Sequence, residues 1–196
     1  MKKTLYLIRH GKTSYNEKRL YCGKSDISLS LQGKKEIKEK RKDIVKISEK
    51  IEKFFTTGMK RTDETFKVLF KDKEFEVIEE LREYNFGDFE GYSYEDLKDN
   101  GDYKNWITDT TKEYKILNGE SKKEFYKRIE LGLNKALDTI EDNCIIVCHG
   151  GVIGTLLELF SDTEDYFYNL QPKCGGGIKI EVIKDKNLKI NVVEEF

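Results

Sequence analysis

The sequence predicts an α/β protein: a three-layer α/β/α sandwich whose sheet is mostly parallel and gains an antiparallel edge strand late in the chain. Three observations predict this fold. Short apolar runs of strand length alternate with helical patterns, two alternating segments near the end flank a turn at residues 185–187, and no repeat or linker interrupts the pattern. The 196 residues therefore suit a single domain over residues 1–196, with a small helical cap inserted at about residues 92–118.

The first half of the chain alternates between strand-like and helical patterns. Strands are expected at residues 4–8, 51–57 and 75–78, and helices at residues 31–50 and 60–70. The first helix is supported by Ile37, Ile44 and Ile51, which recur near helical spacing among lysines and glutamates. Residues 81–91 lose this periodicity and gain glycine and aromatic residues, so they are predicted to form a functional loop.

The second half begins with the predicted cap and then returns to long helices and strands. The expected elements are short helices at 94–98 and 103–107, a long helix at 121–142, a strand at 144–148, a helix at 152–160, and a hairpin of residues 177–183 and 188–194. Ser121 and Glu124 form a predicted capping box at the start of the long helix. Trp106, with Tyr103 and Tyr114, forms either a small lid or an ordinary aromatic cluster, and the cluster is slightly favoured.

The charge composition argues against some classes of partner. The chain has 36 basic and 37 acidic residues, so its net charge of −1 gives no attraction toward nucleic acid or an anionic membrane. The apolar stretch after Met1 ends at Arg9, which is too short for a signal-peptide core or a membrane span. A cytoplasmic protein that binds a small molecule is expected. A homodimer is possible, but the sequence does not decide the oligomeric state, because the evenly mixed charge marks no interface.

The four cysteines do not predict a disulfide framework. Cys22, Cys144, Cys148 and Cys174 include no Cys-x-x-Cys pair and are accompanied by no export signal, so free thiols are expected. Cys144 and Cys148 lie four residues apart on one predicted strand and should share a buried face. A zinc site built from two cysteines and the histidines is disfavoured, because no ligand pair has the short spacing that such sites use.

Both histidines of the chain end apolar runs and are followed by glycine. His10 follows the run at residues 5–8 and Arg9, whereas His149 follows the run at residues 144–148. Because ligand crevices form at the carboxyl ends of parallel strands, the two imidazoles are predicted to share one site. Two unrelated histidines in loops are the alternative, and the repeated pattern makes the shared site the stronger hypothesis.

Other familiar motifs are incomplete. Gly11-Lys12-Thr13 resembles the end of a P-loop, but residue 6, where the loop requires its first glycine, is a tyrosine. His149-Gly150-Gly151 resembles an esterase oxyanion loop, yet the sequence has no Gly-x-Ser-x-Gly elbow. Neither a Walker-type nucleotide site nor serine hydrolysis is therefore predicted.

Phosphoryl transfer through histidine fits the remaining residues. A neutral His10 can attack phosphorus, and the transferring group spreads negative charge over its oxygens, so it needs donors that Arg9, Arg61 and His149 can supply. Glu83, in the predicted functional loop, is the candidate that protonates the leaving oxygen and then activates water. The arginines should lower the pKa of His10, and bound phosphate should raise the pKa of His149.

These residues, with others in the same order, resemble the histidine phosphatase superfamily and its phosphoglycerate mutase-like fold. The matching residues, within about residues 4 to 160, are Arg9-His10-Gly11-Lys12-Thr13, Asn16, Gly23, Asp26, Leu29, Gly33, Lys60-Arg61, Thr65, Glu83, Gly87, Glu90-Gly91, Gly119-Glu120-Ser121 and His149-Gly150. The resemblance implies that His10 becomes phosphorylated and that Glu83 is the proton donor, with no cofactor and no metal. It also implies a phosphate-binding and substrate-binding set of Arg9, Gly11, Thr13, Asn16, Cys22, Gly23, Arg61, His149 and Gly150.

Departures from the family pattern bear on the reaction. Tyr84 follows Glu83, where the phosphoglycerate mutases that resemble this chain carry an arginine, and only a short stretch joins Gly91 to Gly119. Both changes remove means of holding a second phosphate or carboxylate, so hydrolysis of a phosphate monoester is predicted. Lys12 replaces the family's usual glutamate or glutamine, and it either adds positive charge at the mouth of the site or faces solvent.

The expected substrate is a small phosphorylated metabolite. The α-ribazole phosphatases, the sugar phosphatases and the nucleotide phosphatases of the family all resemble the chain. A cofactor-dependent phosphoglycerate mutase is the alternative within the family. A non-catalytic protein that binds a phosphorylated ligand or regulates another protein is the alternative from a different class. That alternative predicts the loss of a central residue, whereas His10, Arg9, Arg61, Glu83 and His149 are all present.

Overall fold

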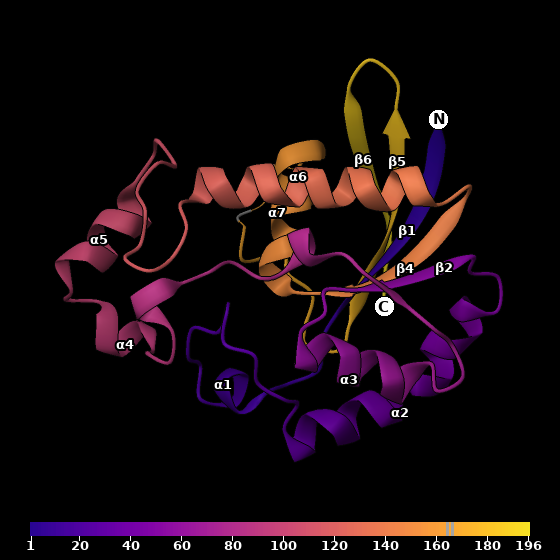
Figure 1. Ribbon diagram of the computed structural model, residues 1–196, viewed down its shortest axis with the longest axis horizontal. Coiled ribbons are helices and arrows are strands. Elements are labelled where there is room, and N and C mark those ends of the chain that lie inside the picture. Colours follow the sequence, from indigo (N-terminus) through magenta and orange to yellow (C-terminus); the bar gives the residue numbers. More distant parts are fainter. Residues whose placement is uncertain (164, 166) are drawn as a thin grey trace.

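The computed structural model describes residues 1–163, 165 and 167–196 and holds a six-stranded sheet in the order β3-β2-β4-β1-β5-β6 (Figure 1). The strands are β1 (Lys2–Arg9), β2 (Lys53–Thr56), β3 (Glu76–Val77), β4 (Asn143–Cys148), β5 (Gly177–Lys184) and β6 (Leu188–Glu195). The first four run parallel, and β5 and β6 form an antiparallel hairpin beside β1. The mostly parallel sheet with a late antiparallel edge is therefore confirmed.

Helices cover both faces of this sheet. Figure 1 shows α6 (Lys122–Thr139) on one side of β4, and α2 (Leu31–Ser48) and α3 (Lys60–Leu69) on the other. Alternate residues of β4 enter different cores: Ile145 and Val147 pack with the α2 and α3 side, whereas Ile146 packs with the side of α6 and α7 (Gly150–Phe160). Because successive strand residues point to opposite faces, one buried strand serves both cores. The three-layer α/β/α class is confirmed.

The cysteines behave as predicted. All four are free thiols, and Cys144 and Cys148 are fully buried in the core on the α6 and α7 side. Burial raises the pKa of both thiols, so they serve there as small neutral core residues.

Several element boundaries differ from the expectations. The strand β2 begins two residues later than predicted and α2 ends two residues earlier, while α7 begins at Gly150 rather than at residue 152. A short helix, α1 (Ser14–Glu17), was not predicted; its capping box joins Thr13 to Asn16. The predicted capping box of α6 is present, with Ser121 N–H donating to Glu124 Oε2 over 2.9 Å. Short helices and helix ends depend on such local bonds, which apolar periodicity does not reveal.

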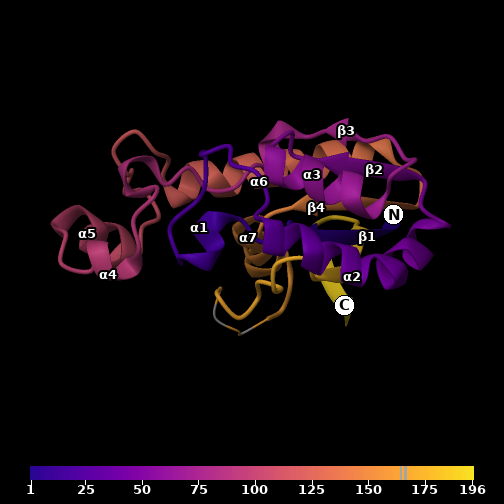
Figure 2. The ribbon, with the colours of Figure 1, turned by 90° about the horizontal axis from the view of Figure 1, so that it is seen from below.

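The segment of residues 92–118, here called the cap segment, contains α4 (Tyr94–Leu97) and α5 (Gly101–Thr108). Figures 1 and 2 show these two helices at one end of the molecule, beyond the start of α6. Trp106 and Tyr103 are buried in the same core cluster as α6, and Trp106 Nε1 donates to Tyr84 Oη over 3.1 Å. The aromatic residues thus form a packed cluster that anchors the cap segment next to the functional loop.

Two short 3₁₀ helices flank or lie in that loop: η1 (Glu79–Leu81) ends at its first residue, and η2 (Gly87–Phe89) lies within it. Among the described residues, no helix is both long and apolar enough to cross a membrane.

Candidate active site

The register of the sheet brings the two histidines together. β1 and β4 are adjacent parallel strands, and Arg9 at the end of β1 pairs with Cys148 at the end of β4. The residues that follow, His10 and His149, consequently face each other, with ring centroids 5.2 Å apart and planes at 66°. They lie at the carboxyl ends of the strands, where open α/β sheets form their ligand crevices.

A single hydrogen bond determines which nitrogen of His10 can react. His10 Nδ1 lies 2.7 Å from the carbonyl oxygen of Gly11, and because a carbonyl can only accept, Nδ1 carries the proton. The opposite nitrogen, Nε2, keeps its lone pair in the neutral ring. Burial, followed by the Arg61 and Arg9 charges, holds the pKa of His10 well below its usual value. The predicted lowering is therefore present, and it favours an uncharged nucleophile at neutral pH.

Two arginines are anchored by their outer nitrogens. Arg61, fully buried in the first turn of α3, donates through Nη1 to the carbonyl oxygen of Ser25 over 2.9 Å and through Nη2 to that of Gly23 over 2.8 Å. Arg9 Nη1 donates to the Pro172 carbonyl oxygen over 3.0 Å. Within the described part of the chain, the Nε atoms of both arginines are buried and have no partner. Neither Nε–H group is therefore committed to an acceptor within the described part of the fold.

His149 contributes a third unpartnered nitrogen. Its Nε2 lies 2.9 Å from Thr57 Oγ1, while its Nδ1 is buried without a partner among the described residues. Burial, then the Arg61 charge and the neighbouring His10, lowers the pKa of His149 well below its usual value. An unsatisfied buried donor costs about 1–3 kcal/mol. Two arginine N–H groups and one imidazole nitrogen without partners near His10 therefore indicate a site whose ligand supplies the missing hydrogen-bond partners.

The carboxylate of Glu83 is held between the functional loop and the start of α7. Its Oε1 accepts from Tyr84 N–H over 2.9 Å, and its Oε2 accepts from Gly151 N–H over 3.0 Å. A Cβ atom on residue 151 would lie 2.3 Å from Glu83 Oε1, so a side chain at this position would displace the carboxylate from its present place. Gly151 is a positioning residue that the sequence interpretation did not include in the site.

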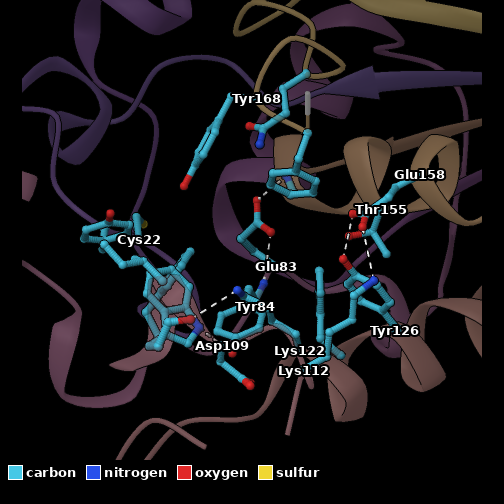
Figure 3. Close-up of a pocket in the computed structure, with 18 of the residues that line it drawn as sticks. Cys22, Glu83, Tyr84, Asp109, Lys112, Lys122, Tyr126, Thr155, Glu158 and Tyr168 are labelled. Carbon is cyan, nitrogen blue, oxygen red and sulfur yellow. Dashed lines mark hydrogen bonds and ion pairs between the residues drawn. The ribbon is translucent and has the colours of Figure 1, made fainter. Parts of the chain in front are cut away.

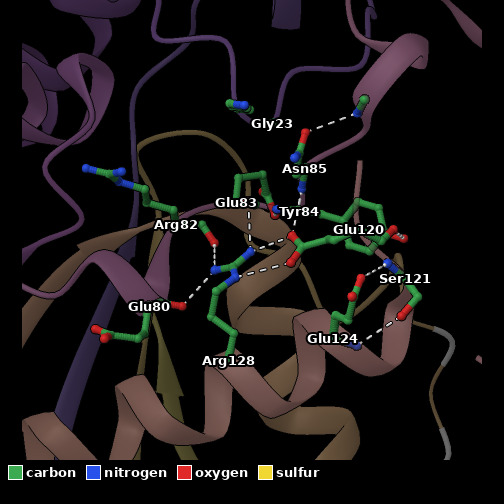
Figure 4. A network of polar contacts seen from close by, with 12 residues as sticks. Gly23, Glu80, Arg82, Glu83, Tyr84, Asn85, Glu120, Ser121, Glu124 and Arg128 are labelled. Atoms are coloured by element: carbon green, nitrogen blue, oxygen red, sulfur yellow. Dashed lines mark hydrogen bonds and ion pairs between the residues drawn. The ribbon is translucent and has the colours of Figure 1, made fainter. Parts of the chain in front are cut away.

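Arg128 on α6 fastens the backbone of the same loop (Figure 4). Its Nη1 donates to the carbonyl oxygens of Glu80 and Arg82, each over 2.7 Å, and its Nη2 donates to that of Glu83 over 3.2 Å. The guanidinium also pairs with Glu120 over 2.6 Å. These bonds fix the loop against α6 directly beneath Glu83. No sequence motif indicated Arg128, because its partners are mostly backbone atoms of a distant segment.

The site opens into a cavity of about 520 Å³, part of whose lining is drawn in Figure 3. Arg9, His10, Asn16, Cys22 and Glu83, all predicted site residues, line it. Burial raises the pKa of the Cys22 thiol to about 11, so Cys22 presents a neutral thiol to the cavity. Arg61 and His149 are fully buried and are not among the residues that line the cavity.

The other predicted substrate-binding residues belong to the framework of the site. Gly11 N–H donates to Thr65 Oγ1 over 3.0 Å, and the Thr13 hydroxyl caps α1. A Cβ on Gly23 would lie 1.7 Å from the Tyr84 carbonyl oxygen, and one on Gly150 would lie 2.7 Å from Arg9 Cζ. The three glycines shape the site through their backbone and Thr13 does so through its hydroxyl, and direct contact with a substrate stays a prediction for all four.

Lys12 is also outside the cavity lining. Its ammonium group binds Glu36 over 2.9 Å on the surface of α2. This contact favours a solvent-facing lysine over an added charge at the mouth of the site.

The remainder of the cavity is lined by residues that no sequence motif assigned to the site. These include Trp106, Asp109, Lys112, Lys122, Tyr126, Thr155, Glu158, Tyr168 and Gln171. Only α7 carried a signal for them: Gly151, Thr155 and Glu158 are spaced four and three residues apart, which places them on one face of an otherwise apolar helix. Over residues 1–163, 165 and 167–196, no group of three or more His, Cys, Asp or Glu side chains could hold a metal ion.

Comparison with known proteins agrees with this geometry. The model of the histidine phosphatase superfamily (branch 1) matches residues 5–187. The chain belongs to this superfamily. A candidate phosphoserine phosphatase 2 from Hydrogenobacter thermophilus is 28% identical over 163 residues, covering 81% of this chain and 79% of that protein. The adenosylcobalamin/alpha-ribazole phosphatase of Salmonella typhimurium is 28% identical over 159 residues, covering 78% of this chain and 77% of that enzyme.

A solved structure has the same fold as this chain. The crystal structure of a candidate alpha-ribazole-5'-P phosphatase from Escherichia coli superposes with a TM-score of 0.81 at 24% identity, covering 98% of this chain and 96% of that one. The expected phosphoglycerate mutase-like α/β fold is therefore confirmed. The relatives named as phosphatases support the prediction that this protein is a phosphatase.

Proposed function

We propose that the protein hydrolyses a phosphate monoester of a small metabolite, without a metal ion, through a phosphohistidine at His10. The observation that carries this proposal is the set of three buried, unpartnered nitrogens, Arg9 Nε, Arg61 Nε and His149 Nδ1, around an imidazole whose Nδ1–H is bound to Gly11. A phosphoryl group has three peripheral oxygens that accept hydrogen bonds, and preorganised donors stabilise the charge on them in the transition state.

In the first step, His10 Nε2 attacks phosphorus and the ester P–O bond breaks. Glu83, in its protonated form, gives its proton to the leaving oxygen, so an alcohol departs rather than an alkoxide. The phosphorylated ring carries a positive charge, which the Gly11 carbonyl oxygen stabilises through the Nδ1–H hydrogen bond.

In the second step, the Glu83 carboxylate takes a proton from a water molecule as that water attacks phosphorus. The P–N bond breaks, phosphate leaves, and His10 returns to its neutral form. Glu83 suits both roles because its oxygens are held by the N–H groups of Tyr84 and Gly151 within the same cavity as His10.

Water is preferred over a second substrate as the acceptor. Tyr84 stands where the mutases that resemble this chain have an arginine, and its hydroxyl donates to the Glu120 carbonyl oxygen over 2.5 Å. Tyr84 is buried in the core cluster, so it brings no cation to the cavity. A phosphoglycerate mutase remains the alternative that the same assays test.

The test is phosphate release from a panel of monoesters in EDTA by the wild type and by His10→Ala. The panel includes α-ribazole phosphate, sugar phosphates, nucleotides, phosphoserine and p-nitrophenyl phosphate. We expect turnover by the wild type, its loss in His10→Ala, and a phosphoenzyme that is labile in acid and stable in alkali. Absence of release from every ester, or activity retained by a folded His10→Ala variant, would overturn the proposal. Exchange of phosphate between phosphoglycerates would support the mutase.

A further inference from the structure

The cavity continues well beyond the phosphoryl site. Gly151 N–H binds Glu83, and Thr155 and Glu158 follow on the same face of α7 and line the same cavity. With a rise of 1.5 Å per residue, Thr155 lies about 6 Å and Glu158 about 10 Å along the helix axis from Gly151. In the proposed mechanism Glu83 protonates the leaving oxygen, so this face offers a path for the remainder of the leaving alcohol. We call the group of Lys112, Lys122, Tyr126 and Glu158 the far end of the cavity.

Thr155, which lines the cavity between Gly151 and Glu158, has a hydroxyl without a hydrogen-bond partner among the described residues. The residue is fully buried. A helical threonine commonly donates to the carbonyl oxygen one turn earlier, so an uncommitted hydroxyl in a cavity wall is informative. The hydroxyl can bind an oxygen of a leaving group that passes from Glu83 toward the far end.

The acidic groups at the far end and next to it, Glu158 and Asp109, already have hydrogen-bond partners. Glu158 pairs with Lys112 over 3.2 Å and accepts from the Tyr126 hydroxyl over 2.6 Å, as Figure 3 shows. Asp109 accepts from the backbone N–H groups of Thr111 and Tyr114, over 2.9 and 2.8 Å. These contacts leave little acceptor capacity for a cationic ligand.

Lys122 differs from these groups. Its ammonium donates to the Trp106 carbonyl oxygen over 3.1 Å and lies 5.5 Å from the centroid of the Trp106 ring. Of the ion pairs between described residues, none includes Lys122, although an ammonium has three donors. Partial burial lowers the pKa of Lys122, because desolvation disfavours the charged form. An anion bound there would restore the lost solvation.

We propose that the leaving alcohol carries a second anionic group, a carboxylate or a phosphate, which binds Lys122 while the Thr155 hydroxyl binds an oxygen between the two ends. This substrate class rests on the proposed phosphatase function. The cation that it assigns to the second anion is Lys122 at the far end, not the residue after Glu83, where Tyr84 replaces the arginine of the mutases.

Two carboxylates, Asp109 and Glu158, also act on Lys122. Lys112 offsets the charge of Glu158. The backbone N–H groups of Thr111 and Tyr114 stabilise the charge of Asp109, and both effects reduce the repulsion of a bound anion. The Trp106 ring lies beside the Lys122 ammonium, and the partial burial of this group strengthens its attraction for an anion.

The test compares esters that differ only in the second anionic group. The carboxylate arm uses 3-phosphoglycerate against glycerol 3-phosphate and phosphoserine against phosphoethanolamine, and the phosphate arm uses glucose 1,6-bisphosphate against glucose 6-phosphate. A charge-assisted hydrogen bond contributes about 1.5–3 kcal/mol, which corresponds to about a tenfold to hundredfold preference in kcat/KM for the anionic member. The arm with the larger preference identifies the anion as carboxylate or phosphate.

Variants assign the preference to Lys122. In Lys122→Gln the ratio of kcat/KM between the paired esters should fall toward one, mainly through a higher KM, and Lys122→Arg should restore part of it. Lys123→Gln is the matched control, because Lys123 is the next residue, lies on the surface and pairs with Glu113. It should keep the wild-type ratio. Thr155→Val, which keeps the shape, should lower kcat/KM for both members of a pair.

The outcomes separate this inference from the proposed function. Equal hydrolysis of the paired esters, preference for phosphoethanolamine, or an unchanged ratio in Lys122→Gln would overturn the inference while p-nitrophenyl phosphate turnover still supports the phosphatase. If no ester is hydrolysed, titration calorimetry of His10→Ala with 3-phosphoglycerate and glycerol 3-phosphate still decides it. Tighter binding of the former, weakened by adding Lys122→Gln, would support the anion site, and equal binding would overturn it.

Discussion

The two ends of the cavity are built in different ways. At the phosphoryl end, Arg9, Arg61 and His149 come from strand ends and the start of a helix, and each has a buried nitrogen without a partner. At the far end, Lys112, Tyr126 and Glu158 come from the cap segment, α6 and α7, and they bind one another. The phosphoryl end is preorganised for a group that every phosphate ester shares. At the far end, most polar groups already have partners within the protein. Changes at the far end should therefore alter substrate preference and leave the chemistry intact.

The largest effect should come from Glu83→Gln, because general acid and base catalysis contributes about 10²–10⁴-fold. The loss of kcat should be large for alkyl esters and smaller in the first step for p-nitrophenyl phosphate, whose leaving group needs no proton. Rapid-quench measurements with that ester should show a burst and an accumulating phosphoenzyme. An equal loss of phosphoenzyme formation with both ester types would show that Glu83 does not act on the leaving oxygen.

Arg61→Gln should lower kcat by the same factor for all esters, which tests the distinction between the phosphoryl end and the far end. The loss of a preorganised donor to the transferring group costs about 10²–10³-fold in kcat. Since the phosphoryl group is common to all esters, the factor should be the same for 3-phosphoglycerate and glycerol 3-phosphate. Lys60→Gln, at an exposed neighbouring position, is the control. A loss that differs between the two esters would place Arg61 on the leaving group and break the distinction.

A smaller effect is expected from Arg128→Lys. Lysine keeps the charge but cannot donate at once to the carbonyl oxygens of Glu80, Arg82 and Glu83. The loop should loosen and kcat should fall by about tenfold for alkyl esters, well within the range of acid and base catalysis, and by less in the burst with p-nitrophenyl phosphate. Lys127→Gln on the same helix is the control. A uniform loss with all esters would indicate a structural role only.

The pH dependence of stability should report on the phosphoryl end. The folded state lowers the pKa of both His10 and His149, so the unfolded chain binds more protons once the pH falls below about 6.5. The free energy of unfolding should therefore be highest above that pH and decrease as the pH falls, by at most about 1.4 kcal/mol per pH unit for each histidine. Urea unfolding between pH 7.5 and 5 measures this slope. His10→Asn should reduce it, and an unchanged slope would contradict the buried neutral state of His10.

Local sequence signals predicted most of the fold and the phosphoryl end. The apolar run of β4 and the helical spacing in α6 depend on burial periodicity, which is written in consecutive residues. The proximity of His10 and His149 could be predicted from the sequence, because parallel strands end at one edge of a sheet. Helix ends and α1 were less predictable, since they depend on individual capping bonds such as that between Thr13 and Asn16.

What the sequence by itself determined is the α/β class, the superfamily motifs and the pair of histidines, because each follows from a pattern along the chain. Only the tertiary structure decided that Gly151 and Arg128 hold the Glu83 loop and that Lys122 faces the cavity without a carboxylate partner among the described residues. Such contacts join segments far apart in sequence, often through backbone atoms that every residue possesses. No local pattern can encode them, because their partners are chosen only when the elements pack.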